Sequence, residues 1–145
     1  GVARRRGGAR RRTRAGGSAA MLAAAGLGAL LAAAAGDAAA RVWRLADPAP
    51  PAGAETTTLA FADGGRVAGQ APCNRYFAEA RRLNGRIRVL GLGATRKLCP
   101  PEIMAAERAY FDALRAARRI RRSGAGLALV DGLGATRLRF EPIAD

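Results

Sequence analysis

Only one stretch of this sequence has the apolar spacing of a helix, and it lies among short runs that alternate like strands. The stretch follows Pro100 and Pro101, and proline is favoured at the first position of a helix. Its C-terminal end carries arginines that suit the negative pole, namely Arg115, Arg118 and Arg119. Side chains at helical spacing form one apolar stripe: Ile103, Ala106, Tyr110, Leu114 and Ala117, widened by Phe111. The stretch therefore predicts one amphipathic helix that ends before Ser123–Gly124.

The other runs from residue 41 onward predict strands. These runs are residues 41–45, 56–61, 66–69, 86–90, 127–130 and 136–140. Tight turns are expected where glycine can take positive φ, at Asp63–Gly64, Asn84–Gly85 and Asp131–Gly132. Several strands, one helix and two more strands predict an α+β fold rather than alternating β/α units. Segment 41–145 has 105 residues, enough for one hydrophobic core.

The first forty residues have a different character. Residues 4–14 contain seven arginines, residues 15–36 contain no charge, and residues 38–40 are all alanine. A basic start, an apolar middle and a small-residue end are the signature of a secretory signal peptide. We therefore expect residues 1–40 to be an export signal, with cleavage after Ala40 or after Ala35.

Two other interpretations of residues 1–40 stay open. The uncharged run of 22 residues is long enough to span a bilayer, so it could be retained as a membrane anchor. Its only large apolar residues are one methionine and four leucines, which makes it a weak anchor. Alternatively, the segment is a tail that is not exported, with translation starting at Met21.

Several motifs from residue 43 onward occur in one order. They are Trp43-x-Leu45, Leu59-x-Phe61-x-Asp63-Gly64 leading to Gly69, Cys73-Asn74-Arg75-Tyr76, Thr95-Arg96 followed by Cys99, and Glu107 with Phe111 and Leu114. In this order and spacing they closely resemble the META domain, the family that includes HslJ-like heat-shock proteins. The resemblance covers nearly all of residues 43–141, and segment 41–145 is identified as a META-like domain.

The resemblance implies a strongly curved, mostly antiparallel sheet with one helix packed on it. It also implies a small domain, often exported or lipid-anchored, that is tied to stress and envelope tolerance and has no accepted catalytic mechanism. Two departures bear on the motif. Pro72 stands where the family usually has glycine, and Lys97–Leu98 stands where it often has Met-Ala.

The chain has two cysteines, Cys73 and Cys99, and no histidine. An even number of cysteines in an exported domain predicts a disulfide; the alternative is two buried free thiols. Without histidine, neither cysteine nor Ser123, the only serine in 41–145, has the usual activating base. We expect no catalytic residue, no metal site and no cofactor.

Glu107 is the acid that most invites a chemical interpretation, because it shares a helix face with Tyr110 and Phe111. The favoured interpretation is a part-buried structural acid held by an arginine, with Arg96 as the candidate partner. Asp112 is spaced to pair with Arg108 at i, i+4. A hydrolase that uses Glu107 for acid–base chemistry is the less favoured alternative.

The densest positive charge is a run of five arginines in eight residues: Arg115, Arg118, Arg119, Arg121 and Arg122. Such a patch suits phosphates of nucleic acid or anionic lipid head groups. The simpler interpretation is a solvated helix end in a composition with 24 arginines and a single lysine. Aromatic residues for base stacking are scarce nearby, so nucleic acid is the less favoured partner.

We therefore expect a non-enzymatic, exported META-like protein of the periplasm or cell envelope. It would bind a ligand or protein of the envelope and support stress tolerance, with an anionic lipid surface as a candidate partner. The alternative is a basic protein that binds nucleic acid or an anionic membrane and retains its arginine-rich tail, since the net charge is +14.

Overall fold

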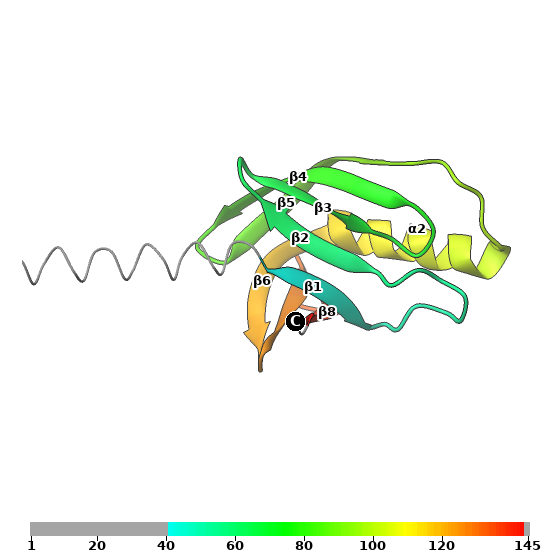
Figure 1. The fold of residues 1–145 in the computed structure, drawn as a ribbon. Coiled ribbons are helices and arrows are strands. Elements are labelled where there is room, and N and C mark those ends of the chain that lie inside the picture. Colours follow the sequence, from blue (N-terminus) through cyan, green and yellow to red (C-terminus); the bar gives the residue numbers. More distant parts are fainter. Residues whose placement is uncertain (1–40, 144–145) are drawn as a thin grey trace, which may run out of the picture. The chain divides into compact units, whose positions relative to one another are not determined.

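The computed structural model describes residues 41–143, in which eight strands and one helix occur (Figure 1). The helix α2 spans Pro101–Ala116 and lies between the fifth and sixth strands. The strands are β1 (Val42–Asp47), β2 (Thr58–Ala62), β3 (Arg66–Gln70), β4 (Arg75–Leu83), β5 (Arg86–Ala94), β6 (Ala117–Ser123), β7 (Gly126–Asp131) and β8 (Thr136–Pro142). The predicted α+β class is confirmed.

Each strand pairs antiparallel with the next one along the chain, and β1 also pairs with β8. The sheet therefore closes on itself in strand order β1 to β8. An ion pair between Arg44 and Glu141 crosses the β1–β8 seam on the outer surface. The expected curved antiparallel sheet is confirmed, and its curvature is complete enough to leave no free edge strand in the described residues.

Alternation along the strands builds one core inside the sheet. In β4, for example, Tyr76, Ala78 and Ala80 are buried while the residues between them are exposed. The helix adds Tyr110 and Leu114 from its apolar stripe to the same cluster. Burying a leucine side chain of this kind stabilises a fold by about 1.5–3 kcal/mol. The largest side chains with almost no exposed surface are Leu59, Leu114, Leu129 and Leu138.

The sheet is weakest between β5 and β6. Arg86 and Arg119 are the only residues paired in register there, and one further backbone bond joins Ile120 N to Gly85 O at 2.8 Å. All other seams have three or more paired positions. The chain runs through α2 between these two strands, and α2 contacts β5, β7 and β8. The helix thus packs against strands on both sides of this seam.

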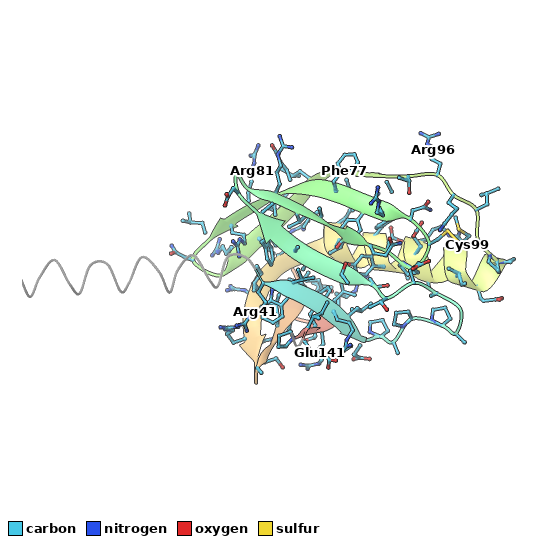
Figure 2. All side chains as sticks on the ribbon, in the orientation of Figure 1. Arg41, Phe77, Arg81, Arg96, Cys99 and Glu141 are labelled. Atoms are coloured by element: carbon cyan, nitrogen blue, oxygen red, sulfur yellow. A yellow bond between two sulfur atoms is a disulfide. The ribbon has the colours of Figure 1, made fainter. Side chains whose placement is uncertain are left out.

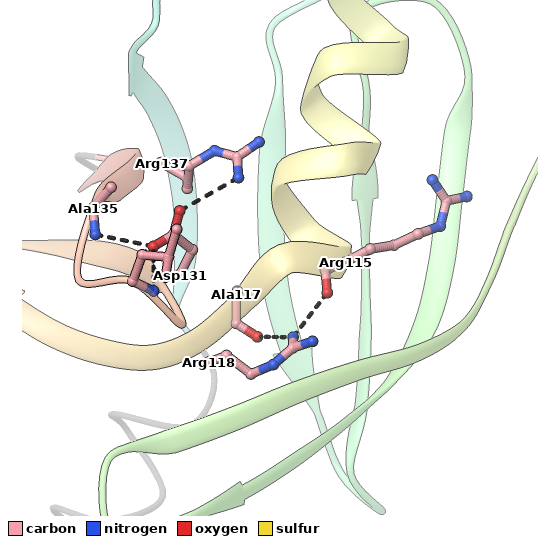
Figure 3. A network of polar contacts seen from close by, with 7 residues as sticks. Arg115, Ala117, Arg118, Asp131, Ala135 and Arg137 are labelled. Carbon is pink, nitrogen blue, oxygen red and sulfur yellow. Dashed lines mark hydrogen bonds and ion pairs between the residues drawn. The ribbon is translucent and has the colours of Figure 1, made fainter.

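The helix ends earlier than its sequence pattern predicts. Ala117 has extended backbone angles (φ −62°, ψ 136°), and residues 117–123 form β6 instead of a last helical turn. The Arg118 guanidinium donates hydrogen bonds to the carbonyl oxygens of Arg115 and Ala117 at 2.9 and 2.8 Å, as Figure 3 shows. It thereby satisfies carbonyls that a helix end leaves unpaired. Arg118 thus lies at the negative end of the helix, as predicted, although it and Arg119 belong to β6.

The expected turns are present, but one strand was missed. Asn84 and Gly85 both have positive φ, at 52° and 80°, as a tight hairpin turn requires. That turn joins β5 to β4, which the sequence analysis did not predict. The β4 segment exposes six charged or large apolar residues, the last three of them consecutive, which obscured its alternation.

The expectations for residues 1–40 lie outside the described residues. Within residues 41–143, no helix combines the length and the apolar character needed to cross a membrane.

Gly69 in β3 is required by a close approach between strands. A Cβ at this position would collide with the backbone carbonyl of Thr58 and lie 3.0 Å from the Tyr76 hydroxyl. We expect Gly69→Ala to lower the free energy of unfolding by about 2–3 kcal/mol, because the backbone must shift to admit the methyl group. Urea denaturation followed by circular dichroism measures this.

Gly132→Ala is the matched control. Its Cβ would make only an ordinary contact, 3.6 Å from the Arg118 side chain. We expect a change within about 0.5 kcal/mol there. An equal effect of the two substitutions would contradict the steric explanation for Gly69.

Candidate functional site

The Cys73–Asn74 motif lies between β3 and β4, where it faces Glu107 of α2. The Glu107 side chain is buried, with 5% of the residue exposed. Its Oε1 accepts hydrogen bonds from the backbone N–H groups of Cys73 and Asn74, both at 2.8 Å. Its Oε2 accepts a third from Asn74 Nδ2, also at 2.8 Å. Three donors therefore surround the carboxylate and offset the cost of removing it from water.

Asn74 extends this network to the segment that follows β5. Its Oδ1 accepts hydrogen bonds from Thr95 Oγ1 at 2.9 Å and from Lys97 N at 2.6 Å. Its Nδ2 also donates to Lys97 O at 3.1 Å. One side chain thus links the β3–β4 connection, the segment 95–100 and the helix. All the side-chain hydrogen-bonding capacity of Asn74 is used within the protein.

Among residues 41–143, no arginine takes part in holding Glu107. Arg96 is exposed and lies on the outer segment after β5, where Figure 2 labels it. The predicted Glu107–Arg96 pair was wrong, because peptide N–H groups supply the compensation that an arginine was expected to supply. The predicted Asp112–Arg108 pair was also wrong, since Asp112 is 3.5 Å from Arg115 at i, i+3 instead.

A disulfide joins Cys73 to Cys99, as predicted. Its Cα atoms are 6.1 Å apart, within the usual range for such bonds. The bond spans a sequence separation of 26 residues. On the loop-entropy model, a crosslink over a loop of this size stabilises a fold by about 3–4 kcal/mol. Segment 95–100 is therefore fixed at both ends, by Asn74 near its start and by the disulfide near its end.

One turn further along α2, Tyr110 meets Tyr76 of β4. The two hydroxyl oxygens are 2.7 Å apart, and Tyr76 also donates to Thr58 O at 2.7 Å. The rings pack edge to face, with centroids 5.6 Å apart, and Phe111 packs against both. Burial raises the pKa of each phenol well above its ordinary value of about 10. The cluster is a second buried contact between α2 and the sheet.

The five arginines predicted to form one patch have different surroundings in the structure. Arg115 pairs with Asp112, and Arg118 caps the helix. Arg119 faces Arg86 across the β5–β6 seam, whereas Arg121 and Arg122 are exposed further along β6. A cleft of 470 Å³ opens at this seam. It is lined by Arg86, Ile87, Arg88, Arg118, Arg119, Asp131, Gly132 and Gly134. The sequence analysis missed Arg86 and Arg88 because they lie some thirty residues earlier.

Comparison with known proteins agrees with this architecture and these motifs. The family model described as "META domain" matches residues 37–143. The chain belongs to the META domain family. An NMR structure of a protein from Burkholderia xenovorans is similar at TM-score 0.59 and 25% identity, over 77% of this chain and 88% of that one. A second NMR structure shares the fold at TM-score 0.55 and 18% identity, over 71% and 89% of the two chains. No curated protein matches the sequence.

The remaining motif residues of this META domain divide into buried and exposed sets. Trp43 is buried in β1, and Phe111 is half-buried beside the tyrosines. Arg75 is exposed, and only its backbone joins the network, through Thr95 Oγ1 at 3.2 Å. Pro72 is compatible with the site, because the two N–H groups that bind Glu107 come from the residues after it. The motif therefore chiefly builds the scaffold, and its exposed members are Asp63, Gly64, Arg75, Thr95 and Arg96.

The network of Glu107 and Asn74 has little capacity for chemistry, because its hydrogen-bonding groups are already used within the protein. Both carboxylate oxygens of Glu107 accept hydrogen bonds from groups of the protein. In residues 41–143, no three His, Cys, Asp or Glu side chains lie close enough to hold a metal ion. The arrangement suits a rigid framework that presents segment 95–100, where Leu98 is 87% exposed.

The saturated carboxylate predicts a specific sensitivity at Glu107. Glu107→Gln turns one acceptor into an NH₂ group that faces either the peptide donors or Asn74 Nδ2. We expect it to lower the free energy of unfolding by about 2–3 kcal/mol, as is typical when a buried group loses a charged partner. Glu102→Gln, on the same helix but exposed, should change it by less than about 0.5 kcal/mol. Equal effects in urea denaturation would contradict the proposed role of Glu107.

The tyrosine pair predicts a pH dependence. Tyr76 and Tyr110 are the only tyrosines in the chain, and the pKa of each is raised by burial. Their unfolded pKa is about 10, so their contribution to stability is complete below that pH and is lost as the pH rises above it. We expect the folded protein to show little tyrosinate absorbance at about pH 10.5, where the urea-unfolded chain is largely ionised. Equal titration of the two states would contradict burial of the pair.

Proposed function

We propose that this META domain is a non-catalytic binding module that is exported to the cell envelope and supports tolerance of stress. The observation that carries the proposal is the Cys73–Cys99 disulfide within the family motif. Disulfides persist in oxidising compartments such as the periplasm and are rare in the cytosol. The order of basic, apolar and small residues in 1–40 supports export independently.

The chemistry of the motif favours binding over catalysis. Its two thiols are joined to each other, and its acid is saturated by Asn74 and the backbone. A general acid or base must exchange a proton with a substrate, which requires a free oxygen at an accessible position. Glu107 has neither, so the hydrolase interpretation lacks support from the geometry.

The exposed segment 95–100 supports a binding role in the envelope. Arg96, Lys97 and Leu98 project from a backbone that is held by Asn74 and by the disulfide. A segment fixed in this way loses little conformational entropy on contact with a partner, which favours affinity. Lys97 and Leu98 are also the positions where the sequence departs from the usual family pattern, so the partner of this protein could differ from those of its relatives.

A second candidate function is supported by the cleft at the β5–β6 seam. Its four arginines suit a basic protein that binds anionic membrane or nucleic acid with its N-terminal tail retained. This candidate predicts affinity that falls steeply with salt. It also predicts that residues 1–40 are not removed from the protein.

The intact mass of the protein, expressed in a bacterial host and alkylated with and without prior reduction, tests the proposal. We expect the mass of residues 41–145 or 36–145, with no alkylation until reduction and two alkyl groups afterwards. A Cys99→Ser variant is the control, because its remaining thiol should be alkylated without reduction. A full-length protein with two freely alkylated cysteines would overturn the export proposal and favour the second candidate.

A further inference from the structure

The cleft at the β5–β6 seam arises from the way the sheet closes. The two strands are in register only at Arg86 and Arg119, and a bulge between Ala117 and Arg119 turns the start of β6 away. The connection between β7 and β8 forms the other wall through Gly132 and Gly134. A cleft of 470 Å³ results, large enough for several phosphate groups or a head group.

Three arginines line this cleft from neighbouring positions, and none of them has an ionic partner within residues 41–143. Arg86 and Arg88 lie two residues apart on β5 and so project from the same face of the sheet. Arg119 lies directly opposite Arg86. Like charges placed opposite each other across paired strands destabilise the pair. In the part of the chain that the structure describes, no carboxylate lies within 4.0 Å of these three guanidinium groups.

A fourth arginine is held in place at the cleft wall. Arg118 donates through Nη1 to the carbonyls of Arg115 and Ala117, as Figure 3 shows. These contacts offset the negative pole of the helix, which would otherwise oppose an anion. They leave Nε and Nη2 free of protein acceptors among the described residues, and those groups carry three N–H donors. The guanidinium is therefore fixed before any ligand arrives.

One carboxylate also lines the cleft, but its charge is largely engaged elsewhere. Asp131 accepts hydrogen bonds from the backbone of Leu133 and Ala135 at 2.9 and 3.0 Å. It also lies 3.5 Å from Arg137, outside the cleft lining. These contacts lower its pKa, the bond from Ala135 most of all. Four arginines against one engaged carboxylate leave a net positive lining.

We propose that this cleft binds a phosphate-bearing anion, through the guanidinium groups of Arg86, Arg88, Arg118 and Arg119. Guanidinium groups match phosphate oxygens in paired, charge-assisted hydrogen bonds. A bound anion would also relieve the repulsion between Arg86 and Arg119. The source is either a free phosphate compound or the phosphate of an anionic lipid head group. The inference rests on the binding role proposed above, but it does not require export.

Titration calorimetry of the full-length chain with sodium pyrophosphate tests the site, with sodium chloride at matched ionic strength as the reference for screening. The cleft variant is the double substitution Arg86→Gln and Arg119→Gln. The matched control is Arg121→Gln with Arg122→Gln, which removes the same charge from exposed positions of the same strand outside the cleft lining. Both variants keep residues 1–40, so binding by the tail affects them equally.

We expect the cleft variant to bind pyrophosphate at least about tenfold more weakly than the unchanged chain, because it loses two charge-assisted contacts. The control should bind within about twofold, because charges outside the cleft act only through screened, long-range attraction. The cleft variant should melt no lower than the control, since it removes two opposed like charges. If it does not fold, Arg88→Gln alone replaces it, with weakening of about threefold or more expected.

Vesicles of phosphatidylglycerol, with phosphatidylcholine as the neutral reference, identify the source of the phosphate. The site is assigned to a lipid head group if two results are found. The cleft variant alone loses binding to the vesicles, and pyrophosphate displaces the unchanged chain from them. Selective loss of pyrophosphate binding, without any such effect on vesicles, assigns it to a free phosphate compound.

If both variants bind each probe equally more weakly than the unchanged chain, diffuse charge explains the binding and the proposed site is overturned. The proposed site is also overturned if neither probe binds the unchanged chain. Neither result bears on export, which the mass measurement tests separately.

Discussion

The buried carboxylate of Glu107 is the interaction on which the arrangement of this domain depends. Removing an ionised carboxylate from water costs several kcal/mol unless hydrogen-bond donors replace the lost solvent. The two N–H groups and the amide that do so belong to Cys73 and Asn74. The helix can therefore settle only where the β3–β4 connection meets it. The disulfide and the contacts of Asn74 with Lys97 then hold the donors in position.

Once Glu107 is placed, the rest of α2 has little freedom. Tyr110, one turn away, reaches the hydroxyl of Tyr76, whose bond to Thr58 needs a glycine at position 69. These contacts explain why motif residues that are far apart in the sequence belong together. They also explain why most of the family motif is buried or half-buried. A motif of this kind chiefly identifies a fold and its scaffold, and segment 95–100 is the part of it that is largely exposed.

The passage of the chain through α2 has a second consequence near the C-terminal end of the helix. Because β5 and β6 are joined by a helix and not by a tight turn, they pair at one position and then separate. Arg86 and Arg119 come together at that position. The positive cleft is thus a product of the topology. It takes only Arg118 and Arg119 from the densest run of arginines in the sequence.

Local signals in the sequence predicted much of this fold. The Asn84–Gly85 turn, the alternating runs and the apolar stripe of the helix rest on interactions between near neighbours, so they could be recognised directly. The end of the helix could not. Residues 117–123 are mostly arginine, which suits a helix as well as a strand, and pairing with β7 decided the outcome. The hydrogen-bond donors to Glu107 were also missed, because backbone N–H groups such as those of Cys73 and Asn74 have no sequence signature.

By itself, the sequence determined the class of fold, its family, the positions of most strands and the two cysteines that join. These follow from periodicity, turn residues and motif spacing, all of which act over short distances or are carried by residue identity. Only the tertiary structure decided that backbone donors surround Glu107 and that arginines from β5 and β6 share one cleft. Both depend on where the closed sheet brings distant segments together, and that is set by packing of the whole core.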